Sequence, residues 1–460
     1  MRRPSRRTVL LGLGAGAAGV VGLRCAVPWW LRVGPVRAVE ELSDEARALV
    51  AAAWAGLDPA RVLDLHVHVV GFGRRGSGCW VNPRFASHLH PLERLRFELY
   101  LAAGGVHDDD EADERYVERL LALLRAAGPA AGAGPRALVL AFDARVGRDG
   151  TEERERSMFV VPDEYVCGLA RAHPELLACA SVHPYRRDAL ERLERAHAAG
   201  AVAVKWLPNA MGIDPAAEVC RPFYAKLAEL GLPLLVHTGE ERAVWSADEQ
   251  EFGNPLRLRA ALEQGVTVVA LHCASLGEAR DLENGGAPTP TLELCLRLLE
   301  RQCAGALGPG RLFGELAAVT LANRPPDVLA TLLARAELHP WLVNGSDYPL
   351  VAIDPLVLLR PLVWRGVLAP EERAPLAEIA AANALLFDLV LKRRLRLPTP
   401  AEERRFAPGD ERRFAPGNEG RFAPGDEGRF APRDGGRFAP RDEGRFAPVA
   451  FESARLFDKL

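Results

Sequence analysis

The chain has 460 residues, 48% of them hydrophobic, which is enough to bury the core of one large domain with appendages. Its net charge of −3 gives no electrostatic case for binding nucleic acid. None of its eight cysteines forms a Cys-x-x-Cys pair, so neither a zinc knuckle nor a thioredoxin-like site is indicated, and we expect buried free thiols.

Residues 1–38 are predicted to be an export signal with its linker. Arg6 and Arg7 stand directly before an apolar run, Val9 to Leu23, that is too short and too rich in glycine and alanine for a transmembrane span. The segment from Ser5 to Leu10 resembles the twin-arginine signal. We therefore expect an exported protein, periplasmic or associated with the cell envelope. An uncleaved N-terminal anchor is the alternative, and it would be the only membrane contact.

A helix is predicted within residues 39–60, and a large α/β domain over 61–392. In that domain eight short apolar runs alternate with helical stretches. The runs expected to be strands are 62–67, 137–142, 176–182, 201–206, 233–237, 266–272, 312–319 and 341–347. Eight strands interleaved with helices predict a (β/α)₈ TIM barrel, with an open doubly wound sheet as the alternative.

Two unusually long loops, 71–91 and 143–162, follow the first and second predicted strands. A barrel places the segments that follow its strands at one face, where long loops commonly shape or cover a site. We expect that role for both loops, and surface decoration is the alternative.

Residues 393–448 are predicted to be a disordered, low-complexity tail. The unit Arg-Phe-Ala-Pro recurs six times with a period of eight, which places Phe at 406, 414, 422, 430, 438 and 446. One Phe per eight residues cannot offset the entropy of ordering the chain. A multivalent binding segment or a cell-envelope tether is the functional alternative. Residues 449–460 are expected to form a short terminal helix.

Polar side chains stand at the ends of six predicted strands. The first strand carries Asp64-Leu65-His66-Val67-His68, in which regular alternation places Asp64, His66 and His68 on one face. His183, Lys205, His237, His272 and Asp347 end the third, fourth, fifth, sixth and eighth strands. A barrel brings these strand ends onto one face. Imidazole and carboxylate groups gathered there suit Zn²⁺, Fe²⁺ or Mn²⁺.

This constellation resembles the amidohydrolase superfamily, in particular its amidohydrolase-2 branch of (β/α)₈ metal enzymes. The resemblance runs from residue 61 to about 390 and includes Ala-Ala-Asn-Ala-Leu-Leu-Phe at 381–387. It implies that a divalent metal ion, Zn²⁺ in the first place, is held by His66, His68, His237 and Asp347. It also implies that His272 is a second-metal ligand or an acid/base that polarises the substrate.

Lys205 leaves the number of metal ions open between one and two. In binuclear members of the superfamily a fourth-strand lysine is carboxylated and bridges two ions. The alternative is a lysine that anchors the substrate beside a single ion, which we slightly prefer. His183 and Glu315, the latter on the seventh strand, are predicted as substrate contacts or as packing residues.

Together these features predict a metal-dependent hydrolase. A metal-bound hydroxide would attack a carbonyl-type C–N or C–O bond of a small molecule, with Asp347 as acid/base and His272 steadying the oxyanion. The second hypothesis is a non-hydrolytic decarboxylase of the same superfamily, with Lys205, Arg74 or Arg75 anchoring a substrate carboxylate. The third is a surface-binding protein with a vestigial barrel, against which the intact ligand set argues. The sequence indicates neither the substrate nor the oligomeric state.

Overall fold

The computed structural model describes residues 33–107, 110–129, 134–246, 249–399, 402 and 444–457. The predicted export signal, apart from its last residues, and nearly all of the predicted repeat tail lie outside these ranges. Within the described ranges, no helix combines the length and apolarity needed to cross a membrane. The seven cysteines described there are free thiols, and all but Cys303 are buried, as expected.

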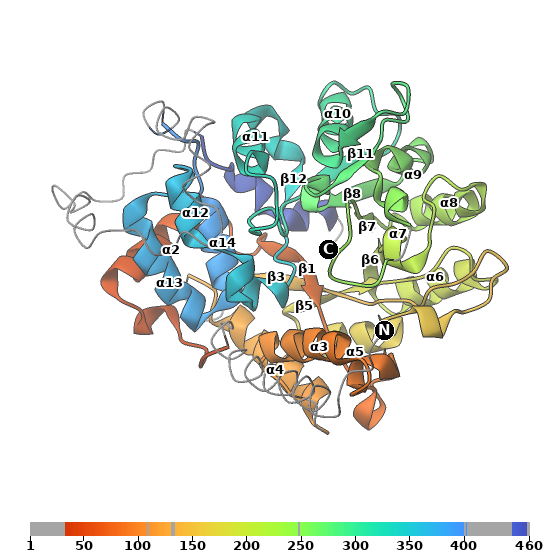
Figure 1. Cartoon of the computed structure of the whole chain (residues 1–460), viewed down its shortest axis with the longest axis horizontal. Helices are drawn as coiled ribbons and strands as arrows, with labels where there is room; N and C mark the ends of the chain where they lie inside the picture. Colours follow the sequence, from red (N-terminus) through yellow and green to blue (C-terminus); the bar gives the residue numbers. More distant parts are fainter. Residues whose placement is uncertain are drawn as a thin grey trace, which may run out of the picture.

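Eight parallel strands form the centre of the molecule and confirm the predicted TIM barrel (Figure 1). Their order around the barrel follows the chain. The bounds are β1 Leu63–His68, β3 Arg136–Leu140, β5 Leu176–Ala180, β6 Ala201–Trp206, β7 Leu234–His237, β8 Thr267–Leu271, β11 Arg311–Glu315 and β12 Leu342–Val343. All eight overlap the apolar runs that predicted them, because a parallel strand covered on both faces needs a nearly continuous apolar sequence.

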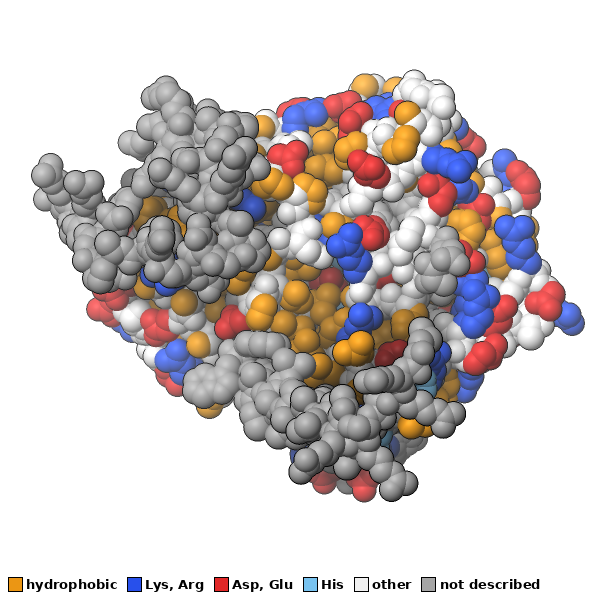
Figure 2. All heavy atoms as spheres, viewed as in Figure 1, with side chains coloured by type: hydrophobic (Ala, Val, Ile, Leu, Met, Phe, Trp, Pro, Cys, Tyr) orange, Lys and Arg blue, Asp and Glu red, His pale blue; other side chains and the backbone are white. Residues whose placement is uncertain are grey.

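Helices form the outer layer of the barrel. Seven of them are α2 Asp44–Trp54, α4 Ala112–Arg125, α6 Ala189–Ala198, α8 Arg221–Leu230, α9 Arg259–Glu263, α10 Thr291–Cys303 and α11 Val328–Ala334. Six more are α3 Pro91–Ala103, α5 Asp163–Ala172, α7 Pro208–Met211, α12 Leu359–Trp364, α13 Arg373–Ala382 and α14 Ala384–Arg394. The N-terminal α2 lies beside the late helices α13 and α14 (Figure 1), so both ends of the barrel sequence pack together. In the same view, hydrophobic side chains gather near the middle of the surface, and charged side chains of both signs are spread over its upper and right-hand parts (Figure 2).

One layer of small and apolar side chains fills the barrel interior, and every strand contributes to it. The layer consists of Leu63, Leu65, Leu138, Leu140, Cys179, Ala203, Leu235, Val269, Leu271, Phe313 and Val343, with Leu456 and Phe457 added from the C-terminal segment. Such layers are how a TIM barrel closes its centre. The functional side chains therefore lie beyond this layer, toward the C-terminal ends of the strands.

The strand β1 changes the face that its side chains occupy partway along its length. Its pairing with β3 is irregular between Asp64 and Val67. Leu65 belongs to the interior layer, yet the next residue, His66, also lines the pocket at the strand end. A bulge re-aims side chains in this way and is common beside active sites. The simple alternation expected for Asp64, His66 and His68 is thus wrong for Asp64, whose carboxylate accepts hydrogen bonds from the amides of His66 and Ser346.

The two long loops pair with each other. Strand β2 (Trp80–Val81) in the first loop and strand β4 (Phe159–Val160) in the second form an antiparallel sheet. The side-chain amide of Asn82 in the first loop donates to the carbonyl of Ser157 in the second, at 2.9 Å. Each loop therefore supports the other above the barrel.

The C-terminal segment closes the opposite, N-terminal end of the barrel. Short 3₁₀ turns cover Pro448–Ala450 and Ser453–Phe457, in place of the expected terminal helix. The hydroxyl of Ser453 accepts a hydrogen bond from the Asn344 amide at 2.8 Å. The predicted tail boundaries therefore differ from the structure: α14 extends to Arg394, and residues 444–457 form one packed segment. Local composition could not show this, because the apolar surface that receives the segment comes from distant parts of the chain.

The barrel closes where the chain after β12 meets β1. Across this seam Leu65 N donates to Asn344 O at 3.0 Å and Asp347 N donates to His66 O at 2.9 Å. Gly345 lies between them with no room for a side chain, since a Cβ there would stand 1.8 Å from Glu315 Oε1 and 2.8 Å from His66 Cβ.

We expect the Gly345→Ala variant to lose about 2–3 kcal/mol of unfolding free energy, because the new methyl group must displace Glu315 or the seam. Chemical denaturation of the full-length protein measures the loss. Gly168→Ala in α5 is the matched control, because a Cβ there meets no atom within 4 Å. This control should be neutral or stabilising by up to about 1 kcal/mol. Equal stability of the Gly345→Ala variant and the parent would contradict the close packing of the seam.

Candidate active site

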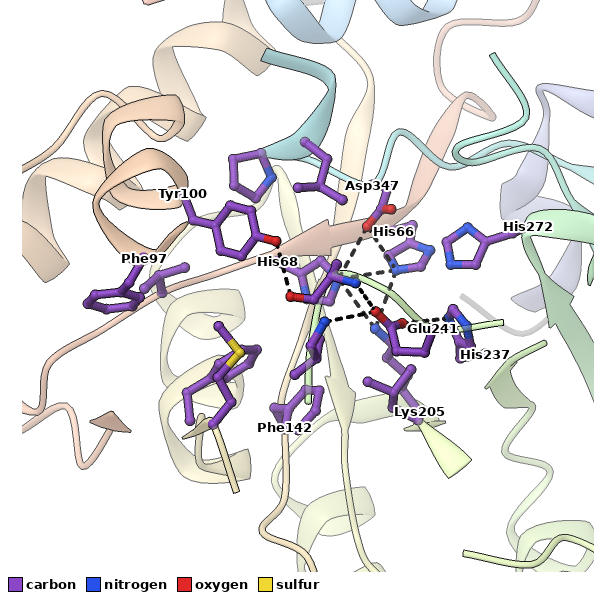
Figure 3. A pocket seen from close by; sticks show the side chains of 18 residues that line it. His66, His68, Phe97, Tyr100, Phe142, Lys205, His237, Glu241, His272 and Asp347 are labelled. Carbon is purple, nitrogen blue, oxygen red and sulfur yellow. Dashed lines mark hydrogen bonds and ion pairs between the residues drawn. The ribbon is translucent and has the colours of Figure 1, made fainter. Parts of the chain in front are cut away.

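A cluster of imidazole and carboxylate groups lies at the C-terminal ends of the strands (Figure 3). His66 Nε2 is 3.2 Å from His68 Nε2, and Asp347 Oδ1 is 3.5 and 3.4 Å from these two nitrogens. One atom from each of the three side chains can therefore bind a single ion. The seam described above sets this geometry, because it brings the first and the last of the barrel strands together.

His66 is held from behind by Glu315 on β11. Glu315 Oε1 is 3.2 Å from His66 Nδ1, and its Oε2 accepts a hydrogen bond from the His272 amide at 2.9 Å. Burial raises the pKa of Glu315 to about 8. A carboxyl group in contact with one imidazole nitrogen leaves the other nitrogen to face the cluster, which is the usual arrangement behind a metal-binding histidine.

His237, at the end of β7, repeats this arrangement with a different partner. Its Nδ1 is 3.3 Å from Glu241 Oε2, and the other carboxylate oxygen accepts from the amides of Ala243 and Val244. His237 Nε2 is buried and has no hydrogen-bond partner. A buried nitrogen without a partner is costly. A metal ion would satisfy it, so the side chains present fit the cofactor that the sequence analysis expects.

His272 completes the histidine group. Its ring stacks on that of His66 at a centroid distance of 5.0 Å and meets that of His237 at 4.9 Å. Its Nδ1 lies 3.3 Å from the carbonyl oxygen of Ala317. Because a carbonyl only accepts, Nδ1 carries the hydrogen, and Nε2 keeps its lone pair when the ring is neutral.

Lys205, at the end of β6, reaches the centre of the cluster. Its Nζ lies 3.3 Å from His66 Nε2 and 3.4 Å from His68 Nε2. Burial lowers the pKa of Lys205, although the carboxylates of Asp347 and Glu241 act in the opposite direction. The amine thus competes with an ion for the same two imidazole nitrogens or, if modified, becomes a ligand itself.

The protonation states in this cluster suit metal binding. Burial lowers the pKa of His66, His68 and His272, and that of His237 to about 3. Burial alone would raise the pKa of Asp347, but the surrounding imidazoles hold it well below its ordinary value. Neutral imidazole and ionised carboxylate are the forms that bind metals.

The backbone is strained at two of these residues. His272 and Asp347 adopt φ values of +61°, which few residues with a side chain adopt. Such strain persists only where the surrounding contacts over-determine it, and it gathers at functional sites. Both residues follow a strand, His272 directly after β8 and Asp347 four residues after β12.

The wall opposite the cluster is apolar (Figure 3). It is built from Val70, Phe97, Tyr100, Phe142, Met158 and Phe159, together with Val244 and Leu350. Phe97 and Tyr100 come from α3, and Met158 and Phe159 come from the second long loop. The predicted role of that loop in shaping the site therefore agrees with its position.

Six of the residues singled out in the sequence line this one pocket: His66, His68, Lys205, His237, His272 and Asp347. His183 does not, since both ring nitrogens are bonded, Nε2 to Met211 O and Nδ1 to the Tyr185 amide. Glu315 lies behind His66. These placements favour packing and positioning over the alternative of substrate contact. Arg74 pairs with Asp110 at 3.1 Å, and the Arg75 side chain lies outside the described residues.

The sequence analysis missed Glu241 and Arg324. Glu241 follows His237 by four residues in His-Thr-Gly-Glu-Glu, and an acidic pair so close to a strand-end histidine is a usable signal. Arg324 follows β11 and carries a buried Nε without a hydrogen-bond partner. Burial lowers the pKa of Arg324 to about 10. Its positive charge adds to the effect of burial in lowering the pKa of His237 and His272.

Among the comparisons with known proteins, a family model matches this chain. The amidohydrolase family model matches residues 63–301, more than half of the chain. No curated protein sequence matches.

Several solved structures resemble this chain at low identity. An uncharacterised TIM-barrel protein from Bordetella bronchiseptica is 16% identical with a TM-score of 0.43, over 72% of this chain and 99% of its own. A putative 2-pyrone-4,6-dicarboxylic acid hydrolase from Pseudomonas putida is 17% identical with a TM-score of 0.39, over 71% and 97%. The 5-carboxyvanillate decarboxylase from Sphingomonas paucimobilis is 11% identical with a TM-score of 0.40, over 70% and 96%. Resemblances this distant do not bear on the reaction. On the match of the family model, this chain belongs to the amidohydrolase-2 family of metal-dependent TIM-barrel enzymes.

Proposed function

We propose that this protein is a metal-dependent hydrolase that cleaves a carbonyl-type C–N or C–O bond in a small molecule. The observation that carries the proposal is the convergence of His66, His68 and Asp347 on one point of an apolar pocket, next to the unpartnered Nε2 of His237. We infer an ion-binding role for this set of donor atoms, because without an ion the buried Nε2 of His237 has no hydrogen-bond partner and such atoms are costly.

His66, His68, His237 and Asp347 would hold one divalent ion, and nitrogen and oxygen donors of this kind suit Zn²⁺. When bound, the ion polarises a carbonyl group and makes water more acidic. Asp347 accepts the proton of the attacking water and returns it to the leaving group. His272 lies close to the ion site and keeps an Nε2 lone pair, so its neutral ring can accept a proton from the reacting group or bind a second ion.

The apolar wall selects the body of the substrate. Phe97, Phe142 and Phe159 offer flat faces to a ring or an alkyl chain, and they exclude water from the reacting group. We therefore propose a substrate with one carbonyl group facing the cluster and an apolar remainder.

A decarboxylase is the second candidate, and two cations favour it, the buried Lys205 and the half-buried Arg324. Lys205 lies inside the cluster, and Arg324 carries a guanidinium nitrogen that lacks a partner. Either could hold a substrate carboxylate, which a decarboxylase requires and a lactone or amide hydrolase does not.

The two reactions differ in what water contributes to the product. We expect the purified enzyme, screened with aryl amides, lactones and aromatic carboxylates in ¹⁸O-labelled water, to place one labelled oxygen in the acid that it forms. Mass spectrometry of the products measures the label. Release of CO₂ without any labelled acid would show that the enzyme is a decarboxylase and not a hydrolase.

The metal site is tested by its stoichiometry. We expect about one ion per chain in the parent protein, and strongly reduced metal in His66→Ala and Asp347→Asn, with activity about 10²–10⁴-fold lower. Elemental analysis by mass spectrometry measures the content. The exposed His88 provides the control, and His88→Ala should keep its metal. About two ions per chain would assign Lys205 the bridging role. Full metal content in both His66→Ala and Asp347→Asn would contradict the proposed metal site.

Glu241 positions His237, and its loss should therefore weaken the metal site without removing a ligand. We expect Glu241→Gln to bind metal about 10–100-fold more weakly, measured by competition with a chromophoric chelator. Glu240→Gln is the matched control, because Glu240 pairs with Arg242 on the surface. Unchanged affinity in Glu241→Gln would show that the contact with His237 is incidental.

We also propose that the protein is exported by a twin-arginine route and acts in the periplasm or at the cell envelope. The support is the segment from Ser5 to Leu10, followed by a short apolar run.

A further inference from the structure

The last Arg-Phe-Ala-Pro unit, residues 445–448, is packed against the barrel at His339, Arg393 and Arg394, and we call the surface formed by these three residues the groove. Phe446 is 1% exposed and lies against the ring of His339 at a centroid distance of 5.5 Å. The guanidinium of Arg393 donates to the carbonyl of Phe446 at 3.1 Å. The unit is therefore bound through both its aromatic ring and its backbone.

Polar groups on the groove are arranged to receive this backbone. His339 Nε2 bonds to the carbonyl of Leu332 at 3.1 Å, which leaves Nδ1 as an acceptor for the Ala447 amide at 3.2 Å. Arg445 donates to the carbonyl of Arg394. The same arginine, phenylalanine and alanine recur in every unit of the tail. None of these contacts uses a feature that only the last unit has.

One neighbouring position separates the units into two groups. Gly444 precedes the docked unit, adopts φ +76°, and accepts a hydrogen bond from the Leu397 amide at 2.8 Å. A glycine is suited to that conformation, and other residues are strained in it. Glycine also precedes the third, fourth and fifth units, at positions 420, 428 and 436, whereas arginine precedes the first two.

We propose that this groove is a binding site for the Gly-Arg-Phe-Ala-Pro segment, and that residues 420–424, 428–432 and 436–440 are alternative ligands for it within the same chain. Exchange of the fifth unit for the sixth leaves residues 441–448 as an extra loop between the groove and the packed segment that follows. Loop-closure entropy grows slowly with length, so an eight-residue loop is tolerated.

The test compares thermal unfolding of four full-length proteins: the parent, Phe446→Ala, a triple variant with Phe422, Phe430 and Phe438 changed to Ala, and the quadruple variant. We expect the triple variant to melt with the parent and Phe446→Ala to melt a few degrees lower. The quadruple variant should lose at least twice as much, because no unit is then left to fill the groove. Failure of the quadruple variant alone to fold would support the proposal equally.

Two outcomes would overturn the proposal. If Phe446→Ala loses as much as the quadruple variant, or fails to fold as it does, the upstream units do not bind the groove. If the difference between these two variants grows with protein concentration, the rescuing unit comes from a second copy of the chain.

A peptide provides an independent measurement. Gly-Arg-Phe-Ala-Pro added to the quadruple variant should raise its melting temperature, and Gly-Arg-Ala-Ala-Pro should not. Equal effects of the two peptides would show that the groove does not recognise the aromatic ring.

Discussion

The seam between β1 and the chain after β12 is the constraint on which the site depends. His66 and Asp347 are far apart in sequence, and they meet because Asp347 N donates to His66 O across this seam. The strand that leads into the seam is short, since β12 pairs with β11 at two residues. The seam is completed by the Asp64 carboxylate, which accepts from the amides of His66 and Ser346. A change in the register between β1 and the chain after β12 would move Asp347 away from His66 and His68, and the three side chains could no longer bind one ion.

A buried network behind the pocket holds the seam. Lys392 of α14 is fully buried and donates to Asp388 at 2.7 Å and to the carbonyl of Gly345 at 2.6 Å. Burial raises the pKa of Asp388 to about 7, and Lys392 partly offsets this effect. An ammonium without such partners would be expensive to bury. The family-like segment at 381–387 has a structural part in this, because the side chain of Asn383 caps α14 and so begins the helix that delivers Lys392.

The strands and strand-end residues were predictable because both follow from local pattern. An apolar run that ends in a polar residue identifies a barrel strand and a residue at its C-terminal end, and this holds for Lys205 and His237. Three features were not predictable in this way. The bulge in β1 arises from its pairing with β3, the pairing of β2 with β4 depends on loops that meet only in the folded protein, and Glu241 acquires a role only from the ring of His237.

The last unit of the tail is packed on the barrel, although the composition of the tail predicts disorder. One Phe per eight residues cannot form a core by itself. Phe446 does not depend on such a core, because its ring packs on His339 of the barrel and its carbonyl accepts a hydrogen bond from Arg393. The Leu397–Gly444 hydrogen bond also joins the two ends of the repeat segment. Gain or loss of whole units therefore changes the length of a closed loop and leaves the barrel contacts unaltered, at a small entropic cost. The folded domain thus constrains the last unit closely and the number of units hardly at all.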